Sequence, residues 1–368
     1  MQPGTPLSRH TREIARTFLA LFVFGACHCA HGQTEQFGVR AIPPSVPPTS
    51  ESPIDSGQVN DAINQLIQRK FVRQDQITVS KYYPVLGASI AARRITFQPE
   101  SQMILGVGSL SGNSVTPSNT PILIWADEIE IQGRAVITWA GDLPANEPPP
   151  RAKAPDGLTG AVFGASGSPG TDGDPGNAGF AGRNAPSILI VANRVIGGPL
   201  LIDLRGGDGG PGGRGQDGGN GGSGARGSPA VSSIFDCRSG PGRGGDAGKG
   251  GDAGPGGPGG QAGSGGDIVL ITLDPAASTA IKAYLDAGER GKGGDPGQPG
   301  RAGQPGDEGF PAPPLCSPAN PRRIGNTAGS GKELKDKGKP GLPGTSGRLL
   351  KVGISQETFN ELITKLGQ

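Results

Sequence analysis

Residues 206–227 read GGDGGPGGRGQDGGNGGSGARG, with glycine at every third position from Gly206 to Gly227. Three residues per turn is the period of the polyproline II helix, and a glycine in each turn leaves one face of that helix without side chains. Disorder requires no such phase, so the phasing predicts packed polyproline II helices. Further runs in a three-residue period cover 164–182, 242–266, 288–309 and 338–347.

The composition leaves little material for a conventional core. The chain has 68 glycines and 36 prolines among 368 residues, and only 4% of its residues are aromatic. Ordinary proteins contain roughly 12% glycine plus proline. We therefore do not expect a single compact globule filled with leucine, valine and phenylalanine.

Two assemblies bring bare glycine faces together: a collagen triple helix between chains, and a bundle of helices within one chain. The runs here are short, and many triplets carry a second glycine, as in 206–211. A second glycine weakens a collagen helix and eases dense bundling. We predict the intramolecular bundle and keep two alternatives, a disordered chain and a collagen-like trimer, the latter because 294–299 reads GDPGQP.

Over residues 157–347 these runs resemble those of bacterial secreted collagen-like and glycine-rich proteins. The triplets are also similar to the glycine-rich polyproline II bundles of some antifreeze proteins, phage tail-fibre adhesins and Obg-type GTPases. The resemblance is architectural, so it implies a fold and no function. This chain has no GTPase motif, and its charged triplets differ from a plain ice-binding face.

Apolar segments of similar sequence separate the glycine runs. They begin at Ile122, Ile188, Ile268 and Leu349, at successive offsets of 66, 80 and 81 residues. One such segment cannot bury its apolar face alone, so the repeats must stack. With a further extended segment at 93–106, they predict a mainly β fold of repeated strand rungs. The rungs form a small β-sheet or β-solenoid, beside a layer of glycine-rich polyproline II helices.

Few short α-helices are expected. Apolar spacing predicts one helix at 58–71. Two others are predicted at 275–285 and 356–366, where Asp274 and Ser355 can serve as N-caps.

The chain divides into five parts. A basic start, an apolar stretch and small residues before Gln33 identify 1–32 as a secretory signal peptide. The remaining parts are a Pro- and Ser-rich linker (33–57), the N-terminal helix and first β layers (58–141), glycine-rich arms (142–348) alternating with β segments (187–204 and 267–273), and a C-terminal strand and helix (349–368).

Cleavage of the signal peptide leaves two of the four cysteines, Cys237 and Cys316. They lie in the predicted tip loops 228–241 and 310–337, which become neighbours if the repeats stack. We predict a disulfide between them, as expected for two cysteines in an exported chain. In the chain-entropy model, a bridge across about 80 residues contributes roughly 4 kcal/mol.

The mature chain lacks the groups for several chemistries. All three histidines precede residue 33, which excludes Ser-His-Asp and Cys-His catalysis and histidine metal sites. Subtracting three arginines and one glutamate of the leader from 34 basic and 32 acidic residues leaves 31 of each. This balance does not steer the protein to nucleic acid or an anionic membrane, and no later segment is long and apolar enough to span one.

Three residues are candidate partner contacts. Trp139 ends a predicted strand near the start of an arm, where its ring could stack on a sugar. Phe235 and Arg238 lie in the first tip loop, and loops on rigid arms are free to vary. Trp125 lies within an apolar strand and is predicted to be core.

We interpret the carboxylates of one apolar strand and those of the glycine runs as structural and not as catalytic or metal-binding groups. Glu128 and Glu130 share one strand face, which we expect to be a solvated outer face and not the carboxylate pair of a glycosidase. Aspartates among the glycines do not follow the nine-residue period of a calcium β-roll. They are expected to pair with arginines and lysines of neighbouring helices. We predict no catalytic residue, cofactor or metal.

The leading prediction is a secreted, non-enzymatic, adhesin-like structural or surface-interaction protein of a bacterium. It would be a monomer that is secreted, held at the cell surface or located in the periplasm. Its tips would contact polysaccharide or protein at the cell surface or outside the cell. One alternative is a collagen-like trimeric extracellular protein. The other is a polysaccharide lyase or hydrolase of the β-solenoid type.

Overall fold

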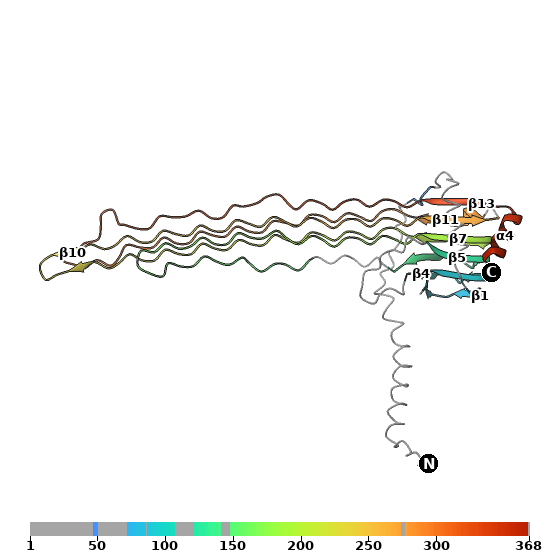
Figure 1. Ribbon diagram of the computed structural model, residues 1–368, viewed down its shortest axis with the longest axis horizontal. Coiled ribbons are helices and arrows are strands. Elements are labelled where there is room, and N and C mark those ends of the chain that lie inside the picture. The colour runs from blue at the N-terminus through green and yellow to red at the C-terminus, as the bar shows by residue number, and fades with distance from the viewer. Residues whose placement is uncertain are drawn as a thin grey trace, which may run out of the picture.

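The structure is a computed structural model that describes residues 47–50, 72–85, 87–106, 121–140, 148–273 and 277–366. Strands gather in a block at one end, and long extended arms run from this block to the opposite end, where β10 lies (Figure 1). The predicted signal peptide at 1–32, the predicted helix at 58–71 and most of the linker at 33–57 lie outside the described residues.

The block consists of two separate parallel sheets, and the chain visits them in alternation. The six-stranded sheet has the order β1 (Gln74–Val79), β3 (Ser89–Phe97), β5 (Ile122–Ile131), β7 (Ile188–Gly197), β11 (Ile268–Thr272) and β13 (Leu349–Gly353). The five-stranded sheet has the order β12 (Ile281–Tyr284), β8 (Leu200–Asp203), β6 (Ala135–Trp139), β4 (Ser101–Leu105) and β2 (Tyr82–Pro84). The predicted mainly β fold with repeated strands is confirmed.

The repeated apolar segments pair in the register that their sequence alignment predicts. Ile122 lies opposite Ile188, and Ile188 lies opposite Ile268. Ile268 in turn lies opposite Leu349. β3 and β4 form the further layer predicted at 93–106, whereas β1 and β2 add a layer that sequence reasoning missed.

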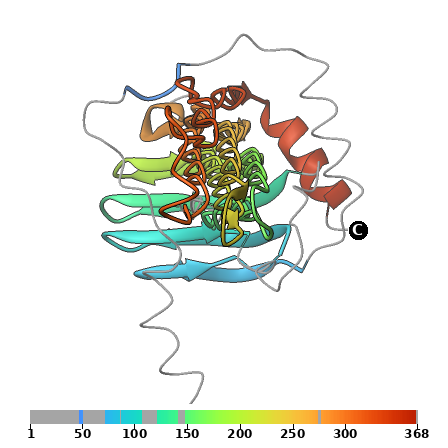
Figure 2. The same cartoon turned by 90° about the vertical axis from the view of Figure 1, so that its left-hand side faces the viewer.

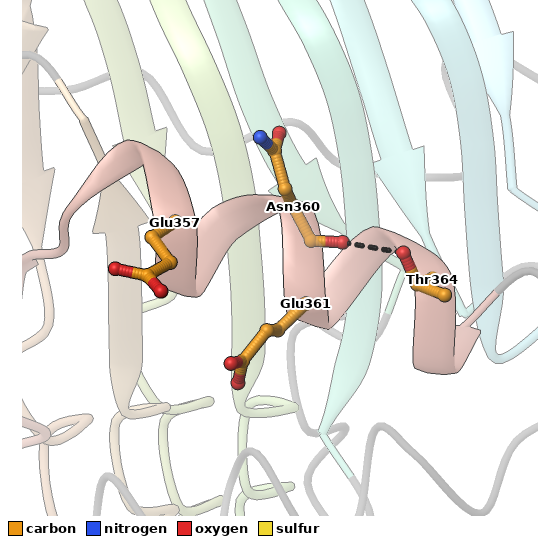
Figure 3. A pocket seen from close by; sticks show the side chains of 4 residues that line it. All are labelled: Glu357, Asn360, Glu361 and Thr364. Atoms are coloured by element: carbon orange, nitrogen blue, oxygen red, sulfur yellow. Dashed lines mark hydrogen bonds between the residues drawn. The ribbon is translucent and has the colours of Figure 1, made fainter.

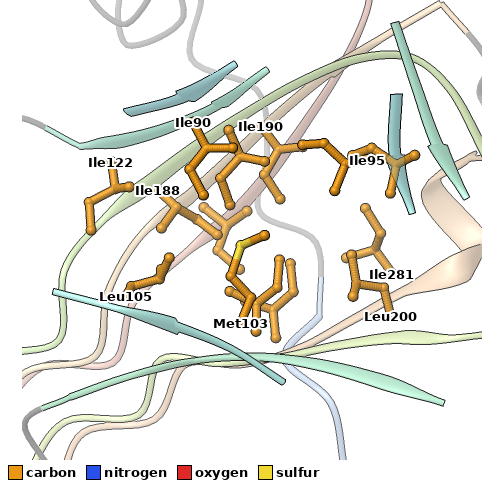
Figure 4. Packing of buried hydrophobic residues seen from close by; sticks show 14 of the residues in the cluster. Ile90, Ile95, Met103, Leu105, Ile122, Ile188, Ile190, Leu200 and Ile281 are labelled. Carbon is orange, nitrogen blue, oxygen red and sulfur yellow. The ribbon is translucent and has the colours of Figure 1, made fainter. Parts of the chain in front are cut away.

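A buried apolar layer fills the space between the sheets. Ile122 and Ile188 from the six-stranded sheet lie near Met103 and Leu105 from the five-stranded sheet (Figure 4). Each fully buried aliphatic side chain of this kind contributes about 1.5–3 kcal/mol. Stacking therefore supplies the burial that one pair of strands could not.

The outer face of the six-stranded sheet is partly covered by α4 (Gln356–Leu366), which crosses it (Figure 3). Trp125 of β5 and Phe359 of α4 belong to one buried cluster there. The Ser355 hydroxyl accepts the Thr358 N–H at 3.2 Å, as an N-cap does. The predicted C-terminal helix, its cap and the core position of Trp125 are confirmed.

The helix predicted at 275–285 is wrong. α3 (Ala277–Ala280) is a single turn, after which the chain continues as β12 and pairs with β8. Ile281 and Ala283 are buried on either side of the exposed Lys282. A strand period therefore places both apolar side chains in the inter-sheet core, next to β8.

Three arms leave the block, each after a strand of the five-stranded sheet and each returning to the six-stranded sheet. They are arm 1 (148–187), arm 2 (204–267) and arm 3 (285–348). Glycine N–H groups join their runs at three-residue intervals: Gly206, Gly209 and Gly212 of arm 2 donate to carbonyls of arm 3 at 2.8–2.9 Å. The glycine runs thus pack on one another within one chain.

Double glycines in arm 2 serve two neighbours. The Gly206 N–H donates to the Asp286 carbonyl of arm 3, whereas the Gly207 N–H donates to the Arg183 carbonyl of arm 1, both at 2.9 Å. Arm 2 contacts both other arms, so two residues of each such triplet lie close to the backbone of another arm, one to arm 1 and one to arm 3. This explains the second glycine of its triplets.

Side chains would separate the arms at most of these glycines. A Cβ built on Gly257 would lie 2.0 Å from the Asn177 carbonyl oxygen, far inside ordinary contact at 3.4–4 Å. A Cβ on Gly329 of arm 3 would meet nothing within 4 Å. Absence of a side chain is therefore required inside the bundle and is optional at its margin.

Residues 47–50 lie against β12, the end strand of the five-stranded sheet. The Thr49 N–H donates to the Ala283 carbonyl at 2.7 Å, and its hydroxyl accepts the Leu285 N–H at 3.1 Å. Edge strands expose unpaired backbone groups, so this contact covers part of an edge.

Candidate functional site

The far end of arm 2 is a β-hairpin in which β9 (Val231–Ser232) pairs with β10 (Cys237–Ser239). Ser233 organises its turn. The Ser233 N–H donates to the Asp236 carbonyl at 2.8 Å, and its hydroxyl accepts the N–H groups of Phe235 and Asp236 at 3.2 and 3.1 Å. Local hydrogen bonds therefore hold the apex of the hairpin.

A disulfide joins this hairpin to the tip of arm 3. It links Cys237 to Cys316, with a Cα–Cα distance of 5.1 Å and a sequence separation of 79 residues. Cys316 closes a turn in which it and Ala312 exchange two backbone hydrogen bonds of 2.8 and 3.0 Å. The predicted staple between the two tips is confirmed.

Apolar side chains are exposed around this disulfide, at the end of the molecule that faces the viewer in Figure 2. Ile234 and Phe235, adjacent at the apex, are each 87% exposed. Phe310 lies under the guanidinium of Arg226, 4.3 Å from carbon to ring centroid. We call these exposed residues the tip patch: Val231, Ile234, Phe235, Phe310 and Leu315.

Two of the three predicted contact residues lie at this tip. Phe235 and Arg238 are exposed on the same hairpin, on either side of Cys237. Trp139 is instead 7% exposed, and its indole N–H donates to the Arg205 carbonyl at 3.0 Å. The expectation of an accessible ring was wrong because the side chain points into the inter-sheet core.

Sequence reasoning placed partner contacts in the tip loops but did not single out Ile234 or Phe310. The apolar pair Ile234–Phe235 stands between Ser233 and Asp236, residues that favour turns. Two large apolar residues in the turn of a short hairpin have no core to enter. This pattern could have identified the apex.

The carboxylates of β5 form a charge ladder. Glu128 pairs with Arg94 of β3 at 2.9 Å and with Arg194 of β7, and the three residues lie in register across three strands. Glu128 is only 8% exposed, so the solvated outer face expected for it is wrong, because strands and arginines on both sides cover it. Glu130 is half-buried and accepts a hydrogen bond from the Thr96 hydroxyl at 3.4 Å. These contacts join neighbouring strands and do not set two carboxyl groups on opposite sides of a sugar, as glycoside hydrolysis requires.

Aspartates in the arms accept backbone N–H groups of the next arm. Asp246 accepts the Asn326 N–H at 2.7 Å, which holds the pKa of its carboxyl below the usual value. Asp252 accepts the Lys332 N–H at 2.8 Å, and this bond, followed by the Lys249 ammonium, likewise lowers its pKa. Both bonds span 80 residues, close to the offset between strands. In the described parts of the chain, no group of three metal-ligating side chains comes together.

An open depression lies on α4, lined by Glu357, Asn360, Glu361 and Thr364 (Figure 3). The Thr364 hydroxyl donates to the Asn360 carbonyl one turn earlier at 2.8 Å, so it is occupied within the helix. All described lining residues come from this single helix. The depression therefore offers no enclosed site.

Comparisons with known proteins add no assignment. No family model matches the chain, and no curated protein or solved structure shows significant similarity. Among the residues that the structure describes, no helix has the length and apolarity to cross a membrane. The functional conclusion depends on the geometry of this chain.

Proposed function

We propose that the mature chain is a secreted, non-enzymatic protein that presents its tip patch to a cell-surface or extracellular partner. The position of the tip patch is the observation that supports this proposal. Its apolar side chains gather at the end of the arms, beside the disulfide that joins arm 2 to arm 3. Exposed apolar patches on soluble proteins mark interaction sites. The disulfide also agrees with export to an oxidising compartment.

The arms act in this proposal as polyproline II helices. Hydrogen bonding at every third residue supports this assignment, and 22 residues at about 3.1 Å each would span about 70 Å. Bonds between runs of one chain occupy the glycine N–H groups that a collagen-like trimer would need. They favour a monomeric bundle, with an architectural resemblance to bacterial secreted glycine-rich proteins.

The strand block acts as the base of the bundle. Alternation of successive strands between the two sheets supports stacked rungs of a β-solenoid, with arms inserted after the rungs that contain β6, β8 and β12. Parallel sheets need both faces covered, and the inter-sheet layer and α4 provide part of this cover. The pairing of Glu128 with two arginines supports a structural role for this face.

A tip-trimmed variant tests the proposal in the producing organism. Residues 231–239 and 312–316 are each replaced by a short Gly-Ser linker, which removes both cysteines together and leaves the glycine runs. Labelled wild-type and trimmed mature protein are added to washed cells and to immobilised extracellular material, and retained protein is measured. We expect the trimmed form to lose at least about tenfold in retention, as for loss of an interface hot spot.

The matched control is Leu158→Ser with Phe163→Ser, which removes two apolar side chains, 79% and 67% exposed, near the turn of arm 1. This variant should be retained like the wild type. Equal retention of trimmed and wild-type protein, both folded by circular dichroism, would contradict the proposal.

A further inference from the structure

The five-stranded sheet ends in β12, and the outer edge of this strand is occupied by a distant part of the chain. β12 pairs with β8 on its inner side. On its outer side, the Thr49 N–H donates to the Ala283 carbonyl at 2.7 Å, and the Thr49 hydroxyl accepts the Leu285 N–H at 3.1 Å. A residue of a parallel neighbour bonds to the same two positions, separated by one residue. Thr49 therefore takes the place of a further strand, with its hydroxyl in the role of a strand carbonyl.

Residues 47–50, which we call the strap, are not brought to β12 by the strand that follows them in sequence. That strand is β1, which lies at the opposite end of the stack (Figure 2). Thr49 is half-buried, whereas Pro47, Pro48 and Ser50 are exposed. The contact of Thr49 with β12 therefore accounts for the position of the strap.

The strap does not offer a new edge in its turn. Pro47 and Pro48 directly precede Thr49, and proline has no backbone N–H to donate. Prolines at the margin of a sheet prevent the addition of another strand. The strap thus pairs with β12 once and ends the ladder of hydrogen bonds.

Without the strap, the edge of β12 would be complementary to itself. Backbone groups of alternate residues point to the same side of a strand, so those of Ile281, Ala283 and Leu285 share the outer edge. A two-fold axis at Ala283 would set this residue opposite Ala283 of a second copy, and Ile281 opposite Leu285 of that copy. Such a pairing uses the same surface on both chains and closes at two of them.

We propose that the strap protects the β12 edge and keeps the mature chain monomeric, and that release of the strap lets the β12 strands of two copies pair in antiparallel fashion. The inference goes beyond the proposed function and does not depend on it. A pair of chains joined at β12 would carry two tip patches on one particle. The strap would therefore set how many tips one particle presents.

Molar mass over a series of protein concentrations tests the inference. The oxidised mature chain (33–368) is compared with a trimmed chain (51–368) by light scattering after gel filtration. We expect one chain per particle for the mature protein throughout, and a mass that rises with concentration to twice that value for the trimmed chain. Thr49→Pro removes both the N–H and the hydroxyl and should act like trimming. Thr49→Ser keeps both groups, so this matched control should remain monomeric.

Hydrogen exchange at Leu285 shows whether the association uses the β12 edge. The amide of Leu285 should exchange at least about tenfold faster in the dilute trimmed chain than in the mature chain, because its acceptor is gone. Its protection should return at concentrations that give dimers. An excess of the peptide 45–52 should restore the mass of one chain, and the same peptide with Thr49→Pro should not.

Two results would overturn the inference. One is a trimmed chain that is folded by circular dichroism and stays monomeric at every concentration, in which case the strap only adds stability. The other is association while the Leu285 amide still exchanges fast, because the contact would then lie elsewhere. If the trimmed chain does not fold, the same two measurements on Thr49→Pro, which changes a single residue, decide between these outcomes.

Discussion

Replacing Gly257 with alanine tests whether close backbone contact holds the arms together. The Gly257 N–H donates to the Gly213 carbonyl at 2.9 Å, and its carbonyl accepts the Gly294 N–H at 2.8 Å. An added Cβ would lie 2.0 Å from the Asn177 oxygen and 2.7 Å from the Gly176 oxygen of arm 1. Both obstacles are backbone atoms, so no change of rotamer can relieve the clash.

The expected magnitude follows from that distance. Ordinary contact starts at 3.4 Å, so arm 1 must withdraw by about 1.4 Å from arm 2 (3.4 less 2.0). Two neighbouring bonds, Gly176 N–H to the Pro255 carbonyl and Gly179 N–H to the Pro258 carbonyl, are both 2.9 Å long and would then be broken. At about 1–3 kcal/mol for each bond left unmade, the free energy of unfolding should fall by about 2–6 kcal/mol.

Urea unfolding followed by circular dichroism measures this change. Gly329→Ala is the matched control, because its Cβ meets nothing within 4 Å, and it should change stability by less than about 1 kcal/mol. If Gly257→Ala and Gly329→Ala shift the free energy of unfolding equally, close packing of glycine backbones is refuted as the source of bundle stability.

Three further perturbations test other parts of the structure. Replacing Cys237 and Cys316 together with serine should lower the free energy of unfolding by up to about 4 kcal/mol, since the bridge closes a loop of about 80 residues; urea curves that do not change on reduction of the wild type would argue against this. Acid should destabilise the arms: the folded-state pKa values of Asp246 and Asp252 lie below their unfolded values. Their contribution is therefore complete above the ordinary aspartate pKa of about 3.9 and is lost as the pH falls through the lower folded-state values. Asp246→Asn with Asp252→Asn should flatten this acid limb in pH-dependent urea unfolding, and an unchanged limb would contradict the assignment. Trp139→Phe keeps an aromatic ring in the core but removes the donor to the Arg205 carbonyl, so stability should fall by about 1–3 kcal/mol; wild-type stability would show that the bond contributes nothing.

The features that sequence predicted are those encoded by period and offset. Glycine at every third residue from Gly206 predicted runs that pack through bare glycine faces. The period alone left a bundle within one chain and a collagen-like trimer both open, and the short runs with double glycines favoured the bundle. The offsets between Ile122, Ile188 and Ile268 specified the strand register, because each offset equals one passage through both sheets and an arm. The disulfide between Cys237 and Cys316 could be predicted from the same repeat, because stacking of the repeats makes the two tips neighbours.

The features that sequence missed depend on distant neighbours. Ile281 and Leu285 fit a helical spacing, but Ile281, Ala283 and Leu285 fit a strand equally well, and β8, about 80 residues upstream, decides between them. The buried position of Trp139 likewise involves a distant residue, because its indole N–H donates to the carbonyl of Arg205 at the start of arm 2.

Small-angle X-ray scattering of the purified mature chain tests the central claim most directly. An intramolecular bundle fixed to a strand block predicts the mass of one chain and a pair-distance distribution with a compact peak and a long tail, reaching beyond about 70 Å. The mass of three chains, or the scattering profile of an unfolded coil, would contradict it.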